Sequence, residues 1–266
     1  MTKPTHVHEK HFRTLLMLAK ILAFLGLGGC TPQMIPGERE RLHAAAEKDV
    51  IAVLFIGNSY SFGIPAAFRK VAESHGRKVR VGHSTYGGWT LAMHMGNAAT
   101  VRKLRDGKWD VVVIQEQSLI PSRDEKWRKA MDPAVRFFAH EARAAGAVPM
   151  LYQTWGRRDG DPDVEGDDFY MMNKRVRSGY ASASRGAGNV TVAPAGDVWE
   201  REFRAGRGRG LYVADGSHPS ALGNMVTAKV FYTAIFGEPA EIRIERLNDC
   251  GQNPGHATPT QEIHGP

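Results

Sequence analysis

Four segments of this 266-residue sequence carry side chains that can take part in acyl transfer, and they lie far apart along the chain. The first reads GNSYSF at residues 57–62. Gly57 permits a tight turn, and Ser59 can act as a nucleophile if a base reaches it. Taken alone, such a Gly-Asn-Ser sequence is more often a simple turn and helix cap.

Two further segments offer hydrogen-bond donors. Residues 84–90 read STYGGWT, and paired glycines let the backbone approach a ligand and direct an N–H group toward it. Residues 115–118 read QEQS and directly follow an apolar run. Amide side chains at that point can donate to a developing negative charge. Each of these segments is equally consistent with an ordinary loop.

The fourth segment, ADGSHPS at residues 214–220, pairs an acid with a histidine. Asp215 and His218 are three residues apart, so a turn can place the carboxylate beside the imidazole. The carboxylate would fix the ring tautomer, and the other ring nitrogen would face outward as a general base. By itself, the same pattern also fits a capping Asp and a surface His.

The elements that must position these segments are short apolar runs alternating with helical patterns. Most of the runs are dense in Val, Ile and Leu rather than alternating, which is typical of strands buried on both faces. We expect strands at residues 50–56, 78–83, 110–115, 148–154 and 190–193. We expect helices at residues 65–75, 90–104, 133–145, 168–184, 197–203 and 220–236. This alternation predicts a parallel sheet with helices on both faces, and functional groups at the carboxyl ends of its strands.

Together, the four segments resemble the SGNH (GDSL-like) hydrolase superfamily. Ser59 matches the nucleophile, Gly88 the glycine of the second motif, and Asp215 with His218 the final DxxH motif. The resemblance covers roughly residues 50–236. It implies a three-layer α/β/α flavodoxin-like fold with a five-stranded, mainly parallel sheet. It also implies ester hydrolysis through a Ser-His-Asp triad and an acyl-enzyme, without a metal or an organic cofactor.

The third segment departs from the superfamily pattern, which is usually GxND. Some related carbohydrate esterases carry a QGES-like motif there, with Gln in place of Asn. That comparison makes Gln115 the third oxyanion donor beside the N–H groups of Ser59 and Gly88, with Gln117 as the alternative. The GNSY and QEQS motifs also resemble a less characterised bacterial branch of the superfamily.

The resemblance favours an acetylesterase that removes O-acetyl groups from carbohydrate or polysaccharide. Trp89, Trp155 and Tyr212 flank the proposed segments and are candidates to line a substrate pocket, although core packing would explain each equally well. One alternative is a short-chain lipase or thioesterase. Another is a non-catalytic carbohydrate-binding protein of the cell envelope on the same fold, which would not need an intact Ser59, Asp215 and His218.

The first 29 residues have the features of a targeting signal. A basic N-terminal stretch precedes an apolar run that is too short for a comfortable membrane span but suits a signal peptide. The run ends in Leu-Gly-Gly before Cys30, which resembles a bacterial lipobox. We therefore expect lipidation at Cys30 and a membrane-anchored lipoprotein of the cell envelope, facing the periplasm or the exterior. An uncleaved anchor or a different cleavage site is the alternative.

Composition fits a single globular domain and weakens the case for nucleic acid as a partner. Hydrophobic residues make up 42% of the chain and charged residues 24%, which excludes a disordered or collagen-like protein. The net charge of +7 falls to +4 without residues 1–29, which hold four basic residues and one acid. We assign residues 30–49 to a tether, 50–246 to the hydrolase domain and 247–266 to a weakly ordered tail.

Overall fold

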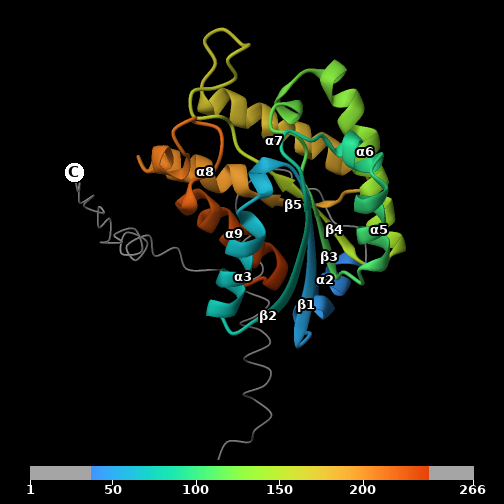
Figure 1. Cartoon of the computed structure of the whole chain (residues 1–266). Coiled ribbons are helices and arrows are strands. Elements are labelled where there is room, and N and C mark those ends of the chain that lie inside the picture. The colour runs from blue at the N-terminus through green and yellow to red at the C-terminus, as the bar shows by residue number, and fades with distance from the viewer. Residues whose placement is uncertain (1–36, 240–266) are drawn as a thin grey trace, which may run out of the picture.

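A five-stranded parallel sheet forms the centre of the computed structural model, which describes residues 37–239 (Figure 1). The strand order is β2-β1-β3-β4-β5, and each neighbouring pair runs parallel. The strands are β1 (Val50–Gly57), β2 (Lys78–Thr85), β3 (Val111–Ile114), β4 (Val148–Gln153) and β5 (Thr191–Pro194). The predicted fold class is confirmed, and this sheet is wholly rather than mainly parallel.

Helices cover both faces of the sheet and complete the three layers (Figure 1). One face is covered by α2 (Glu38–Ala46), α3 (Ile64–Ser74), α8 (Ala195–Arg204) and α9 (Ala221–Phe236). The other is covered by α4 (Leu91–Met95), α5 (Ala98–Asp106), α6 (Glu125–Ala144) and α7 (Phe169–Gly186). Three short 3-10 helices, η1 (Ser59–Ser61), η2 (Ile120–Ser122) and η3 (Gly208–Leu211), lie in the loops of the described chain.

Strand β1 shows why the apolar runs do not alternate with polar residues. Val53 and Phe55 pack into the core beneath α3 and α9, whereas Leu54 and Ile56 pack into the core on the opposite face. All four side chains are fully buried. Because both faces of a central parallel strand are covered, every position must be apolar.

Two helices differ from their predicted extents. The helix predicted at residues 90–104 is divided into α4 and α5, because the Asn97 side chain accepts a hydrogen bond from Thr100 N and starts a new helix. Helix α6 begins well before residue 133, with Asp124 as its N-cap. Proline favours the first turn of a helix, but Pro133 lies in the interior of α6.

Part of the predicted tether belongs to the folded domain. Residues 38–46 form α2, whose Leu42 is buried in the core. The buried carboxylate of Glu38 accepts a hydrogen bond from Arg143 Nε of α6 at 2.7 Å. The domain therefore begins before the predicted boundary at residue 50. The predicted signal peptide, Cys30 and the tail at 247–266 lie outside the described residues. Within residues 37–239, no helix is long and apolar enough to cross a membrane.

Candidate active site

Ser59 lies two residues after the end of the interior strand β1, at the first position of η1. The Asn58 side chain caps this turn, because its Oδ1 accepts a hydrogen bond from Tyr60 N at 3.0 Å. Ser59 itself is half-buried, whereas Asn58 and Tyr60 are buried. The local sequence therefore fixes the backbone and leaves the Ser59 side chain accessible at the carboxyl edge of the sheet.

Gln115, at the end of the neighbouring strand β3, holds this turn in place. Its Oε1 accepts hydrogen bonds from Asn58 N and from Ser61 Oγ, both at 2.9 Å. A Cβ atom at position 57 would lie only 2.3 Å from the same Oε1. Gly57 is therefore required because the Gln115 amide rests against the backbone at that point.

Asp215 and His218 lie in a turn that is closed at its base. Tyr212 and Pro219 form an antiparallel bridge, and Val213 N donates to the carbonyl oxygen of His218 at 3.0 Å. Inside the turn, Asp215 Oδ1 accepts hydrogen bonds from Ser217 N at 2.8 Å and from His218 N at 2.9 Å. The turn therefore orients the carboxylate toward the imidazole ring.

The structure brings Ser59, His218 and Asp215 together in one hydrogen-bonded chain. Ser59 Oγ lies 2.8 Å from His218 Nε2, and His218 Nδ1 lies 2.6 Å from Asp215 Oδ2. Because an ionised carboxylate only accepts, Nδ1 carries the proton and Nε2 is left to accept from Ser59. Partial burial would raise the pKa of Asp215, but hydrogen bonds from Ser217 and His218 hold that pKa below its ordinary value. Asp215 is therefore ionised at neutral pH.

Two backbone N–H groups, those of Ser59 and of Gly88 in the loop after β2, are available to a ligand. Within the described residues, neither Ser59 N nor Gly88 N has a hydrogen-bond partner. Gly88 adopts a left-handed conformation with φ of +73°, which favours glycine, and it is exposed. These are the two backbone donors that the sequence predicts for an oxyanion. Free N–H groups next to a nucleophile can stabilise the negative charge of a tetrahedral intermediate.

Known structures share this architecture. A protein from Slackia heliotrinireducens, described as an SGNH hydrolase, is 31% identical; the match covers 70% of this chain and 98% of that chain, with a TM-score of 0.57. The chain belongs to the SGNH hydrolase superfamily. An acetylxylan esterase, Axe2 from Geobacillus stearothermophilus, shares the fold at 16% identity, with 73% of this chain and 97% of that chain covered and a TM-score of 0.56. No protein-family model matches the sequence, and no curated protein matches it either.

In this SGNH hydrolase, the role predicted for Gln115 as an oxyanion donor has to be corrected. Its side chain is fully buried. Both amide hydrogens are used, because Nε2 donates to Asn58 Oδ1 at 2.9 Å and to the carbonyl oxygen of Glu116. Sequence cannot show that a donor is already occupied. Gln115 positions the serine-bearing turn instead.

Gln117, the alternative from the sequence, has a different environment. Its Oε1 accepts hydrogen bonds from Leu119 N at 2.8 Å and from Ile120 N at 3.3 Å, which fixes the orientation of the amide. In the part of the chain that the structure describes, its Nε2 has no hydrogen-bond partner, and the residue is half-buried. Gln117 therefore has a free side-chain donor in the third motif.

Glu116 is a buried acid that sequence reasoning assigned no role. Its Oε1 accepts hydrogen bonds from Leu91 N at 3.0 Å and from Gln117 N at 2.6 Å, while Oε2 is buried without a partner. The carboxyl group thus links the start of α4, which follows the Gly88 loop, to the third motif. Burial raises the pKa of Glu116 to about 7, although the two backbone hydrogen bonds act in the opposite direction.

Replacing Glu116 with glutamine is expected to change how stability depends on pH. A raised pKa means that the folded chain binds this proton more tightly than the unfolded chain, so stability falls as pH rises from 4.5 toward 7. A glutamine cannot ionise. As pH rises from 5 to 8, the free energy of unfolding of wild type should therefore fall relative to that of Glu116→Gln, by at most about 3 kcal/mol.

Urea unfolding of the two proteins at both pH values measures this difference. The exposed Glu73 of α3 supplies a matched control, because Glu73→Gln removes an acid of the same type from the surface. Parallel pH profiles for wild type and Glu116→Gln would show that burial of Glu116 does not couple its ionisation to folding.

The three aromatic residues predicted to line a pocket divide into two groups. Trp155 is fully buried and Tyr212 is 6% exposed, so the prediction that they contact substrate is wrong. Trp155 stacks against Trp199 with ring centroids 3.7 Å apart, and the Tyr212 hydroxyl donates to the carbonyl oxygen of Gly156. Trp89 is only half-buried, and its ring packs against the exposed Tyr86 at 4.2 Å.

Tyr60 supports His218 and was missed by sequence reasoning. Its ring lies edge-on to the imidazole at 5.4 Å and stacks on Trp155 at 4.9 Å. Its hydroxyl lies 2.7 Å from Ser217 Oγ. The only sequence signal was the position of Tyr60 directly after Ser59 in the GNSY motif.

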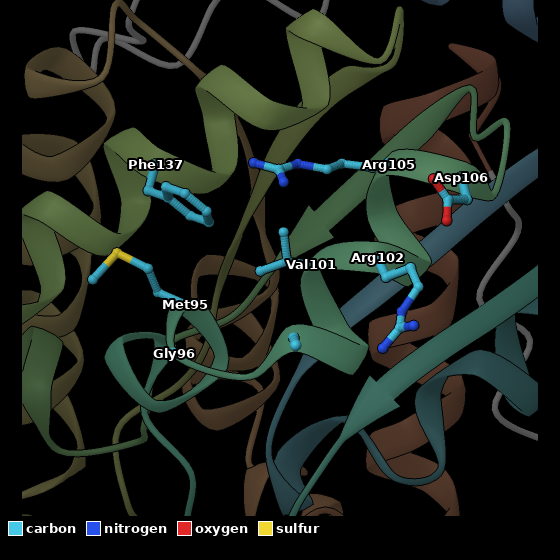
Figure 2. Close-up of a pocket in the computed structure, with 8 residues that line it drawn as sticks. Met95, Gly96, Val101, Arg102, Arg105, Asp106 and Phe137 are labelled. Atoms are coloured by element: carbon cyan, nitrogen blue, oxygen red, sulfur yellow. The ribbon is translucent and has the colours of Figure 1, made fainter.

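A surface hollow of about 560 Å³ lies apart from these residues, between α4, α5 and α6. Figure 2 shows Arg105 extending past Val101 toward Phe137 in this hollow. Arg105 is already paired with Glu141 of α6. None of the residues that line the hollow belongs to the four motifs. Within residues 37–239, no cluster of three or more His, Cys, Asp or Glu side chains is arranged to hold a metal ion.

Proposed function

We propose that this protein is a serine ester hydrolase in which Ser59, His218 and Asp215 act as a catalytic triad. The observation that carries the proposal is the continuous hydrogen-bonded chain from Ser59 Oγ through both ring nitrogens of His218 to Asp215. The free N–H groups of Ser59 and Gly88 beside it support the same chemistry. A binding protein would need neither feature.

The proposed reaction proceeds through an acyl-enzyme. Ser59 Oγ attacks the ester carbonyl carbon while His218 Nε2 takes the serine proton, and Asp215 stabilises the imidazolium. His218 then gives that proton to the oxygen of the leaving alcohol as the ester C–O bond breaks. Water attacks the acyl-enzyme, losing a proton to His218, and Ser59 recovers its proton when the acid is released.

We assign the third oxyanion donor to Gln117, on the basis of its free Nε2. Gln117→Glu keeps an oxygen to accept from Leu119 N and Ile120 N but removes the donor. Its kcat should fall about 10²–10³-fold with little change in KM, because the lost hydrogen bond forms in the transition state. Steady-state kinetics of wild type and variant measure this. A kcat within about threefold of wild type would remove Gln117 from the oxyanion hole.

The proposed substrates are O-acetyl groups on carbohydrate. The side chains of His218 and Asp215 are 42% and 47% exposed, so the site is open to a bulky alcohol. Aromatic surface lies beside it, because Phe62 and Tyr86 are 57% and 40% exposed and a Cβ on Gly87 would lie 3.9 Å from the Phe62 ring. Aromatic faces of this kind suit the apolar faces of sugar rings. A protein of the same fold is named an acetylxylan esterase.

Hydrolysis rates on acetylated oligosaccharides and on nitrophenyl esters of increasing acyl length test this assignment. An acetylesterase should prefer the acetyl group and lose activity as the acyl chain lengthens. Equal or better turnover of long acyl chains would instead identify a lipase or thioesterase. The lipidated, envelope-anchored N-terminus remains a prediction from residues 1–30.

A further inference from the structure

A short segment after β4 runs alongside the turn that carries His218. Trp155 Nε1 donates to the carbonyl oxygen of Ser217 at 3.1 Å, and Arg158 N donates to the carbonyl oxygen of Gly216 at 2.8 Å. Arg157 lies between these two contacts. Its backbone is therefore held directly beside the histidine-bearing turn.

The base of the Arg157 side chain is rigid. Its backbone N–H donates to Met172 Sδ at 3.1 Å, and the preceding Gly156 N donates to Asn173 Oδ1 at 3.2 Å. A Cβ atom on Gly156 would lie 2.7 Å from the carbonyl oxygen of Phe169, so the segment packs closely against α7. The point from which the Arg157 side chain leaves the backbone is therefore fixed relative to α7.

The guanidinium group of Arg157 acts on the same hydroxyl that contacts the His218 turn. Burial raises the pKa of Tyr60, while its hydrogen bond with Ser217 and the positive charge of Arg157 act to lower that pKa. The Tyr60 ring lies against His218. The hydrogen bonds on either side of Arg157 independently place the residue beside the His218 turn, on the β4 side of the proposed triad.

This charge has no counter-charge in the described chain. No carboxylate of residues 37–239 forms an ion pair with Arg157, and its Nε is buried without a hydrogen-bond partner. Other arginines nearby are paired, as Arg158 is with Asp159 and Arg175 is with Asp167. An unpaired, half-buried cation is costly, and an incoming anion would offset that cost.

We propose that Arg157 binds an anionic group of the ester substrate, so that the natural substrate is an acylated acidic carbohydrate. The inference rests on the proposed esterase function. A guanidinium group offers a planar fork of N–H donors that matches the oxygens of a carboxylate or a phosphate. A carboxylate on the sugar ring that carries the acetyl group is the form we favour, and a sugar phosphate shares the same chemistry.

Three acetylated substrates that differ only in charge test the proposal: a uronic-acid oligosaccharide, its carboxyl-reduced neutral form and a sugar phosphate. Wild type should prefer an acidic substrate, and the uronate-to-phosphate ratio identifies the anion. Arg157→Gln should raise KM for the acidic substrate about ten- to a hundredfold more than it raises KM for the neutral one. Arg157→Lys should restore part of the loss because it keeps the charge.

Arg102→Gln is the matched control, since this arginine of α5 has no ion pair within residues 37–239, lines the hollow of Figure 2 and lies outside the four motifs. It should change none of the rates. Equal losses on acidic and neutral substrates in Arg157→Gln would show that Arg157 only supports Tyr60, and no loss on either would also overturn the proposal.

Binding separates this inference from the esterase function itself. Calorimetry with the uronate oligosaccharide and Ser59→Ala protein requires no turnover. Weaker binding after the additional Arg157→Gln substitution would support the anion site even if every ester tested were inert. Unchanged affinity in that double variant would exclude it, whatever the catalytic result.

Discussion

Ser59→Ala should lower kcat for ester hydrolysis by about 10⁵–10⁶-fold, to the residual rate that binding and the oxyanion donors supply alone. The reason is that, among residues 37–239, Ser59 supplies the hydroxyl that contacts His218 Nε2, at 2.8 Å. Initial rates on an activated acetyl ester, with purified wild type and variant at equal concentration, measure the loss.

The neighbouring Ser61 provides a control within the same motif. Its hydroxyl is buried and donates to Gln115 Oε1, so Ser61→Ala removes a serine without removing the proposed nucleophile. We expect a loss below about tenfold, since one buried hydrogen bond is removed while the reacting groups remain. Equal losses in both variants, or residual activity of Ser59→Ala near that of wild type, would contradict the nucleophile assignment.

Asp215→Asn should lower kcat by about 10⁴-fold with little change in folding. An asparagine keeps an oxygen for the N–H groups of Ser217 and His218, so the turn is preserved. Its amide can donate to Nδ1, however, and this favours the tautomer that carries its proton on Nε2. That nitrogen then cannot accept the proton of Ser59.

Rates and thermal unfolding midpoints of Asp215→Asn, measured on the same preparations, separate these effects. A fall in kcat with an unchanged midpoint supports control of the tautomer. A fall below about tenfold would show that the carboxylate does not orient His218 during the reaction.

The candidate site could be placed at one edge of the sheet from the sequence because the rule for parallel sheets is geometric. Ser59 follows one predicted strand and Gln115 ends another, so their position at the carboxyl edge could be predicted from the strand pattern. The structure adds that β1 and β3 are neighbours in the sheet. The approach of His218 could not be derived from strand positions, because it comes from a turn near the end of the chain. There, the resemblance of the Asp215–His218 pair to a known motif supplied the prediction.

The roles that depended on hydrogen-bond occupancy were not predictable. Gln115 and Gln117 are the same residue type two positions apart. Gln115 Nε2 donates two hydrogen bonds, whereas Gln117 Nε2 has no hydrogen-bond partner within residues 37–239. Trp155 looked like a pocket residue because it follows β4, but it is packed between Tyr60 and Trp199. Only the three-dimensional neighbours decide whether a strand-end residue faces the substrate or the core.

Some predicted boundaries of helices and of the domain were wrong for a related reason. The segment of residues 38–46 has the polar composition of a tether, but Leu42 and the ion pair between Glu38 and Arg143 fix it to the domain. Three buried apolar side chains, Leu42, Ala45 and Ala46, and one long-range ion pair leave little trace in composition. Similarly, the division of the helix predicted at 90–104 depends on one capping side chain, Asn97.

The central claim, that Ser59 is an activated nucleophile, is tested most directly by reaction with a fluorophosphonate followed by mass spectrometry of the intact protein and its peptides. The account predicts one phosphonyl group per chain, located on Ser59, and no such product in Ser59→Ala or His218→Ala. A wild-type protein that stays unmodified while a known serine esterase reacts, or one that is modified at another residue, would contradict it.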